Sequence, residues 1–84
     1  MNWNPKDNGW TEAGDKLSKT FSFPNFRDAM SWMMKVSYIF DKMDHHPEWT
    51  NEYNKVHVSL TTHSAGKKIT EKDLKAAELI DKTL

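Results

Sequence analysis

Cysteine is absent from the sequence, which excludes a disulfide framework and thiolate chemistry. Charge of neither sign is in excess, because 12 basic and 12 acidic side chains give a formal net charge of zero. We therefore expect no electrostatic footprint for nucleic acid or for an acidic membrane surface. No apolar run approaches the roughly 20 residues of a membrane span, and no basic and then apolar signal segment begins the chain. These absences together predict a soluble, cytoplasmic domain.

Glycine-rich loops are lacking as well, so the chain offers no phosphate cradle, and no serine lies in a recognisable nucleophile motif. Large side chains are plentiful instead, since four Trp and five Met occur among 84 residues. A chain of this length forms one small domain, 1–84, with a modest core. Such domains are often helped by oligomerisation.

The N-terminal segment, 1–16, is polar and is interrupted by one proline and two glycines. These breakers predict an irregular arm over 1–9. Trp3 and Trp10 are expected to pack back onto the domain and so to tie this segment down. A short strand that includes 10–12 would pair with the strand that follows.

Two stretches alternate apolar and polar side chains with the period of a strand. The first, 17–23, has its apolar residues on one side and is broken only by Lys19. The second, 55–63, is the cleaner of the two, and His57 lies on its polar side as a solvated residue. Its inward-facing set is Val56, Val58, Leu60 and Thr62. A shorter strand is expected within 49–53.

A helix is predicted from Phe26 to about His45, after Asn25 as the N-cap. Its expected core face comprises Phe26, Ala29, Met30, Met33, Val36, Phe40 and Met43. Trp32 and Ile39 lie off the edge of this face and form a second apolar patch. That patch would be a subunit contact, or it would lie under the N-terminal arm.

A second helix follows Thr70, which begins a capping-box variant with Asp73 at its last position. The apolar face expected for this helix is Leu74, Ala77, Ile80 and Leu84. The order of strands, helix, strands and helix, with short connections, favours an α+β fold. We predict a small antiparallel sheet with both helices packed on one face.

Histidines gather where predicted elements end. His45 and His46 close the long helix, and Pro47 disfavours helical geometry at His46, so that the two rings should diverge. Asp41 and His45 are four residues apart and would be neighbours on the helix surface. His63 ends the cleaner alternating run. We predict that these three histidines converge in one pocket.

Two chemistries suit such a pocket, although an isolated histidine is usually a plain surface residue. In the first, the histidines bind a metal, with Asp41 or Asp44 completing the ligand set. Adjacent histidines on a turn cannot easily aim both rings at one ion, and His-x-x-x-His spacing is absent. In the second, imidazoles tuned by carboxylates transfer protons. The second fits better and predicts a dehydration, a hydration or an isomerisation.

The histidines belong to a longer pattern of an acidic residue, His-His-Pro, and then Tyr, His and Asp at set spacings. The residues that match it are Asp41, His45, His46, Pro47, Tyr53, His63 and Asp73. Flanking segments match as well, at 21–26, 46–49, 53–56 and 60–63. This pattern closely resembles the pterin-4a-carbinolamine dehydratases, and the resemblance covers about residues 10–84.

That resemblance implies a four-stranded antiparallel sheet, assembled as a homodimer or homotetramer. It implies dehydration of 4a-hydroxytetrahydrobiopterin to quinonoid dihydrobiopterin, a step in tetrahydrobiopterin recycling, with the pterin as substrate and neither a metal nor another cofactor. The catalytic positions that it assigns are Asp41, His45, His46 and His63. The substrate-binding positions are Asp44, Trp49, Thr61 and Thr62. Within this set we expect His45 and His63 to transfer protons and His46 mainly to bind.

The resemblance also implies a second class of function, because some members of that family bind a transcription factor and aid its dimerisation. The patch of Trp32 and Ile39 could serve such a protein partner or self-assembly. Two departures from the family pattern are visible. A helix usually precedes the Gly-Trp pair matched here by Gly9 and Trp10, and 1–8 are too few and too broken for it. The acidic position is often Glu, so Asp41 would reach His45 less directly.

Overall fold

The fold is that of a computed structural model, which describes residues 3–84. Its helices are α1 (Phe26–Met43) and α2 (Glu71–Asp81), and its 3-10 turns are η1 (Lys6–Asn8) and η2 (His63–Ala65). Its strands are β1 (Thr11–Ala13), β2 (Lys16–Ser22), β3 (Glu48–Glu52) and β4 (Lys55–Leu60). No helix within 3–84 is both long and apolar enough to cross a lipid bilayer.

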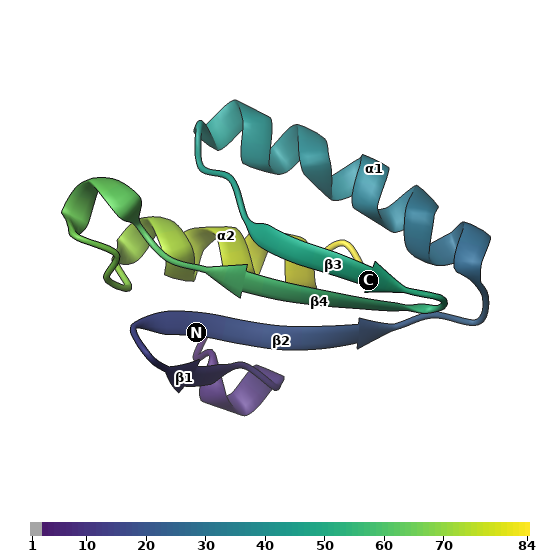
Figure 1. The fold of residues 1–84 in the computed structure, drawn as a ribbon, viewed down its shortest axis with the longest axis horizontal. Helices are drawn as coiled ribbons and strands as arrows, with labels where there is room; N and C mark the ends of the chain where they lie inside the picture. The colour runs from purple at the N-terminus through teal and green to yellow at the C-terminus, as the bar shows by residue number, and fades with distance from the viewer. Residues whose placement is uncertain (1–2) are drawn as a thin grey trace.

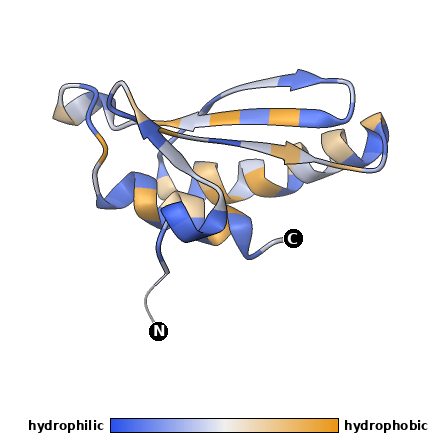
Figure 2. Cartoon of the chain, turned by 90° about the horizontal axis from the view of Figure 1, so that it is seen from below, coloured by the Kyte–Doolittle hydropathy of each residue, from blue (hydrophilic) through white to orange (hydrophobic). Residues whose placement is uncertain are grey.

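The strands form a four-stranded sheet in the order β1-β2-β4-β3, and every neighbouring pair is antiparallel. Both helices lie on the same side of this sheet, as the two views in Figure 1 and Figure 2 show. The predicted α+β architecture is therefore confirmed. Because β3 and β4 are joined by a tight turn, the end of α1 and the loop after β4 lie at one end of the molecule (Figure 1).

The inner face of the sheet is set by the alternation along β2 and β4. Its buried members are Leu17, Phe21, Val56, Val58 and Leu60. On the outer face Ser18 contacts Ser59 at 2.9 Å, and Thr20 contacts Nδ1 of His57 at 2.8 Å. His57 is 43% exposed there, in agreement with its prediction as a solvated residue.

Helix α1 begins as predicted, because the side chain of Asn25 accepts a hydrogen bond from the backbone N–H of Asp28 at 2.8 Å. Its buried face is Ala29, Trp32, Val36 and Phe40. The prediction that Trp32 forms an outlying surface patch is wrong, since its ring lies 4.4 Å from that of Phe21 and is only 5% exposed. An indole buries more apolar area than a methionine, so the helix is rotated to bring it into the core.

That rotation leaves part of the predicted core face of α1 in solvent. Phe26 and Met30 are 49% and 44% exposed. At the end of α2, Leu84 was likewise expected on the core face but is 68% exposed. The face that α2 buries consists of Asp73, Ala76, Ala77 and Ile80.

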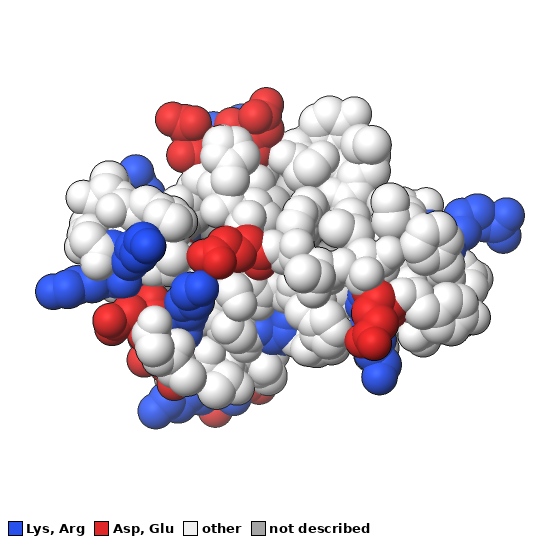
Figure 3. All heavy atoms as spheres, in the orientation of Figure 1, with Lys and Arg blue, Asp and Glu red and all other residues white. Residues whose placement is uncertain are grey.

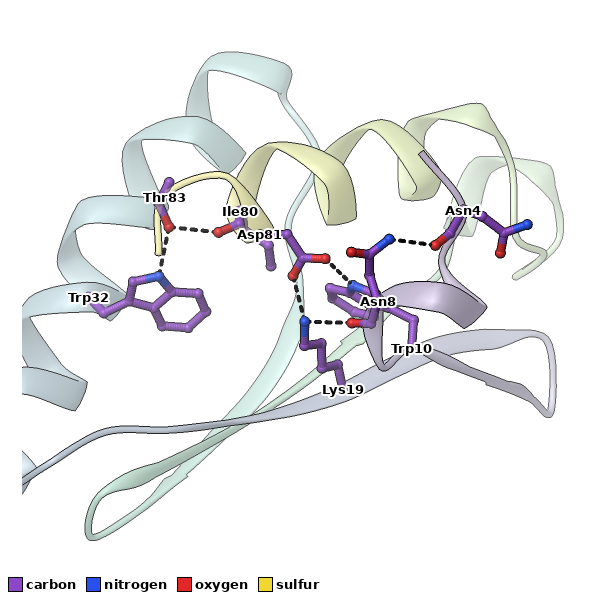
Figure 4. Close-up of polar contacts among 8 residues, drawn as sticks. All are labelled: Asn4, Asn8, Trp10, Lys19, Trp32, Ile80, Asp81 and Thr83. Atoms are coloured by element: carbon purple, nitrogen blue, oxygen red, sulfur yellow. Dashed lines mark hydrogen bonds and ion pairs between the residues drawn. The ribbon is translucent and has the colours of Figure 1, made fainter. Parts of the chain in front are cut away.

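Trp10 anchors the N-terminal segment, as the sequence suggests. It is 3% exposed and donates its indole N–H to Oδ2 of Asp81 at 2.9 Å. Lys19, which interrupts the apolar alternation of β2, points inward and binds Oδ1 of Asp81 at 2.9 Å and the carbonyl of Asn8 at 2.7 Å (Figure 4). The polar exception in the strand is thus explained by a carboxylate supplied from the last residue of α2.

Candidate functional site

The end of α1 separates the two adjacent histidines. Asp44 adopts a left-handed conformation with φ of 52°, and its N–H bonds to the carbonyls of the last helical turn. The backbone N–H of His45 then returns to the carbonyl of Phe40 at 3.0 Å. As a result the His45 side chain is 8% exposed, whereas the His46 side chain is 64% exposed. The prediction that the two rings diverge is therefore confirmed.

A buried carboxylate holds His45 in place. Nε2 of His45 lies 2.6 Å from Oδ1 of Asp73, a residue that is completely buried in the first turn of α2. The other oxygen of Asp73 accepts hydrogen bonds from the Thr62 hydroxyl at 2.7 Å and from the Thr70 backbone N–H at 2.8 Å. Because both donors direct hydrogens at Asp73, this carboxylate acts as an acceptor, and the matching arrangement for His45 is a hydrogen on Nε2.

The other ring nitrogen of His45, Nδ1, is available to the pocket. Within 3–84, every buried side-chain nitrogen and oxygen has a hydrogen-bond partner. No described residue hydrogen-bonds Nδ1 of His45, so that atom is not sealed in the interior. With the hydrogen held on Nε2 by Asp73, Nδ1 presents a lone pair at the wall of the cavity.

One pocket of ≈ 380 Å³ contains all three histidines of the predicted cluster. It lies between the end of α1, the end of β4 and the first turn of α2. Among the predicted site residues, those that line it are Asp44, His45, His46, Thr61, Thr62 and His63. His63, on η2, is exposed and stands at the loop after β4, as its place at the end of the alternating run suggested.

Asp41 and Trp49 lie in a different hollow. A neighbouring pocket of ≈ 380 Å³ is lined by Ser37, Tyr38, Phe40, Asp41, His46, Pro47 and Trp49, so His46 and Pro47 form the wall between the two pockets. The expectation that Asp41 lies beside His45 is wrong, because α1 ends at Met43 and His45 turns inward. Oδ1 of Asp41 lies 3.8 Å from Nε2 of His46 instead.

Thr61 and Thr62 are buried in the wall of the histidine pocket, at 3% and 4% exposure. Their hydroxyls already donate within the protein, to the carbonyl of Asp15 and to Asp73 respectively. They shape the cavity and fix the carboxylate. Among the predicted site residues, the polar groups that remain available at its mouth come from the exposed residues Asp44, His46 and His63.

The sequence analysis did not assign Asp73 to the site. It was visible as the last position of the capping box and as the last member of the histidine pattern, yet nothing local showed that it reaches His45. The capping box is present, with Asp73 bonding back to the Thr70 N–H. Glu48 and Lys72 also line the pocket, and no sequence signal pointed to them.

The metal-binding hypothesis requires several ligating side chains close to one another. Among the side chains that the structure describes, no group of three or more His, Cys, Asp or Glu residues has the arrangement of a metal site. The pocket instead combines one oriented imidazole, two exposed imidazoles and the exposed carboxylates of Asp44 and Glu48. Such a set can donate a proton at one point of a bound molecule and accept one at another.

Comparison with known proteins places these features in a family. The sequence profile described as Pterin 4 alpha carbinolamine dehydratase matches residues 2–83. A relative from Prochlorococcus marinus, which carries the name "Putative pterin-4-alpha-carbinolamine dehydratase", is 46% identical over 79 residues, covering 94% of this chain and 82% of the relative.

Solved structures agree on the fold. A "transcriptional coactivator/pterin dehydratase" from Brucella melitensis superposes with a TM-score of 0.82 and 37% identity, over 87% of this chain and 79% of that one. A pterin dehydratase-like protein identified as a RuBisCO assembly factor of the α-carboxysome has a TM-score of 0.73 at 18% identity, over 87% of this chain and 86% of that one. The second likeness concerns the fold alone.

Proposed function

Because the chain belongs to the pterin-4a-carbinolamine dehydratase family, we propose that it dehydrates 4a-hydroxytetrahydrobiopterin to quinonoid dihydrobiopterin and water. The observation that carries the proposal is the single pocket that holds His45, His46 and His63, with His45 oriented by the buried Asp73. A pocket of ≈ 380 Å³ is within the size range of small-molecule sites.

The reaction balances with two proton transfers and no change of oxidation state. A general acid protonates the 4a-hydroxyl so that the C–O bond breaks and water leaves. A general base removes a proton from a ring nitrogen, which restores the electron pair to the ring system. Each transfer by a positioned side chain is worth roughly 10²–10⁴ in rate. The pterin is therefore substrate, and the chemistry requires no further cofactor.

His45 and His63 are suited to the two transfers, from different walls of the pocket. The Asp73 contact fixes the His45 ring and its tautomer and leaves Nδ1 toward the substrate. His63 lies on η2 after β4, lines the same pocket, and is exposed, so it can exchange protons with solvent. His46 is exposed on the wall shared by the two pockets and mainly binds, with Asp44 beside it.

Histidine-to-alanine substitutions test this proposal. His45→Ala and His63→Ala should each slow quinonoid dihydropterin formation by about 10²-fold or more, measured by stopped-flow absorbance on freshly generated carbinolamine. His57→Ala is the matched control, because His57 lies on the outer face of the sheet and should leave the rate unchanged. An unaltered rate in both active-site variants, with folded protein, would refute the dehydratase proposal.

The metal alternative is separated by elemental analysis of protein prepared without chelators. The acid–base proposal predicts full activity without stoichiometric metal. Zinc at about one ion per chain, lost together with activity on chelation, would replace it with metal-ion catalysis.

A protein-binding role is the second candidate function, favoured by exposed apolar side chains on α1. The predicted patch of Trp32 and Ile39 cannot serve it, since Trp32 is in the core. Any such role has to use side chains that reach solvent. If binding a partner protein were the main role, His63→Ala would leave the biological effect intact while substitutions on exposed α1 residues abolished it.

A further inference from the structure

A second hollow of ≈ 380 Å³ adjoins the histidine pocket, and the two proton transfers proposed above make no use of it. It lies between the last turns of α1 and the start of β3 (Figure 1). His46 and Pro47 line both cavities and form their common wall. Because the His46 side chain is 64% exposed, a bound molecule can extend from one cavity to the other along the surface.

The walls of this hollow are mainly aromatic, with Tyr38, Phe40 and Trp49 among its lining residues. Phe40 is buried, and its ring meets that of Trp49 edge to face at a centroid distance of 5.6 Å, which fixes the orientation of the indole. Tyr38 borders the hollow from α1 and is 71% exposed. Such walls favour a planar apolar group, because aromatic rings attract one another beyond the area that they bury.

The charge of the hollow is negative. Among the described residues that line it, Asp41 is the only Asp, Glu, Lys or Arg, and its side chain is 86% exposed. Figure 3 shows acidic groups near the end of α1 and near the start of β3, with uncharged atoms between them. A carboxylate without a neighbouring cation disfavours an anionic group in the hollow and favours a neutral group that donates an N–H.

The chemistry of a pterin places its variable group within reach of this hollow. In the pterin ring, C4a, from which water leaves, is separated by N5 alone from C6, which carries the substituent. A pterin with C4a among the histidines can point C6 toward His46 and Pro47, where the substituent meets the aromatic hollow. In the opposite direction the substituent would meet the exposed polar residues His63, Ser64 and Lys72. An apolar substituent is therefore directed to the hollow.

We propose that this hollow is the subsite for an aromatic 6-substituent, so that the preferred substrates are pterins with an arylaminomethyl group on C6. The inference rests on the dehydratase function proposed above. The bicyclic ring occupies the histidine pocket, the aryl ring packs against Tyr38 and Trp49, and Asp41 accepts the arylamine N–H. The two cavities together stay within the roughly 300–1,000 Å³ of small-molecule sites.

The side chain of biopterin suits the same hollow less well. That side chain is a short chain with hydroxyl groups, which would leave much of the aromatic wall in contact with water. Hydroxyl groups placed against these rings without hydrogen-bond partners would also lose free energy on leaving water. The hollow thus discriminates between two kinds of 6-substituent on the same reacting ring.

Equilibrium binding of oxidised pterins tests the subsite without any turnover. The probes 6-methylpterin, biopterin and 6-(anilinomethyl)pterin share one ring system and differ only at C6, and isothermal titration calorimetry gives their dissociation constants. The anilinomethyl compound should bind about tenfold or more tightly than 6-methylpterin, whereas biopterin should gain little. Equal dissociation constants for all three, or no binding of the anilinomethyl compound, would overturn the proposal.

Substitution of Tyr38 locates the preference in the hollow. Tyr38→Ala removes an exposed wall and should reduce the preference for 6-(anilinomethyl)pterin over 6-methylpterin by about five- to tenfold. Tyr38→Phe retains the ring and should retain the preference. Tyr53→Ala is the matched control, because Tyr53 is 67% exposed in the turn between β3 and β4 and lines neither cavity. With folding confirmed by circular dichroism, an unchanged preference in Tyr38→Ala would refute the subsite.

This outcome is separable from that of the dehydratase proposal. The dehydratase proposal is judged by the rates of the His45→Ala and His63→Ala variants, and the subsite is judged by binding alone. Loss of the aryl preference together with slowed histidine variants would remove the subsite and keep the dehydratase function. An aryl preference together with unaltered rates would keep the pterin-binding subsite and refute the dehydratase function.

Discussion

Two carboxylates hold nitrogen groups at opposite ends of α2, and one of these nitrogen groups, His45, lines a pocket. At the first turn of α2, Asp73 holds His45, and at its last residue Asp81 holds Lys19 and Trp10. Both carboxylates are largely removed from solvent, with side-chain exposures of 0% and 11%. Burial and pairing alone therefore do not distinguish a functional group from a structural one.

The two clusters differ in whether the nitrogen group bound by the carboxylate still has an atom free to interact with a ligand. Lys19 is occupied by Asp81, by the Asn8 carbonyl and by the rings of Trp10 and Phe21, whose centroids lie 5.7 and 4.8 Å from its Nζ (Figure 4). His45 contacts Asp73 through Nε2, and its Nδ1 remains available at the wall of the pocket. The difference indicates that the Asp81 cluster joins the chain ends, and that the Asp73 cluster orients a reactive group.

The largest expected effect follows replacement of Asp73. Asp73→Ala removes the acceptor of three buried donors and should cost about 3–5 kcal/mol of unfolding free energy. Asp73→Asn retains one acceptor oxygen and most of the fold, yet it no longer has one acceptor oxygen for His45 and another for Thr62 and the Thr70 N–H, so the His45 tautomer is no longer fixed. The rate constant for dehydration should then fall by about 10²-fold or more with a smaller change in KM.

Urea unfolding and pterin turnover on the Asp73 variants supply the measurement. An Asp73→Asn protein that is folded and fully active would show that the carboxylate is merely structural. Asp73 would then have the same structural role as Asp81, and the proposed difference between the two clusters would be refuted.

The intermediate effect concerns Asp81. Asp81→Ala deprives Lys19 and the Trp10 indole of their acceptor, both partly buried, and should lower the unfolding free energy by about 1–3 kcal/mol. Activity per folded molecule should not change, because this cluster is remote from the histidine pocket. Denaturant titration combined with turnover, normalised to the folded fraction, checks the separation. A selective loss of rate at unchanged stability would contradict it.

The smallest effect is expected at Glu78, on the exposed side of α2. The hydrogen bond from Lys82, at 2.8 Å, lowers the pKa of Glu78 below its ordinary value of 4.5. A carboxyl with a lowered pKa in the folded state stabilises the fold above its ordinary pKa, and this stabilisation is lost as the pH falls through the folded pKa. Glu78→Gln should therefore be slightly less stable than wild type at neutral pH. The difference should vanish in acid, as followed by thermal melting; a difference that grew below pH 4.5 would refute the assignment.

The sequence predicted the elements well where local patterns suffice. The alternation of β4, the Asn25 cap and the Thr70 capping box each depend on neighbours along the chain, and each is found in the structure. The rotation of α1 was mispredicted because Trp32 competes with the seven residues of the predicted face, and only its packing against Phe21 and Phe23 decides which side is buried. The exposure of Phe26 and Met30 is the consequence of that choice.

In the site, too, local sequence patterns predicted some features and tertiary contacts decided others. By itself, the sequence determined which residues could do the chemistry: adjacent histidines before a proline that must diverge, and a third histidine at the end of a strand. Only the tertiary structure decided that Asp73, rather than Asp41, serves His45. The reason is physical: the helix stops at Met43, a left-handed Asp44 turns His45 inward, and the contact with Asp73 spans 28 residues of chain, beyond the reach of any local pattern.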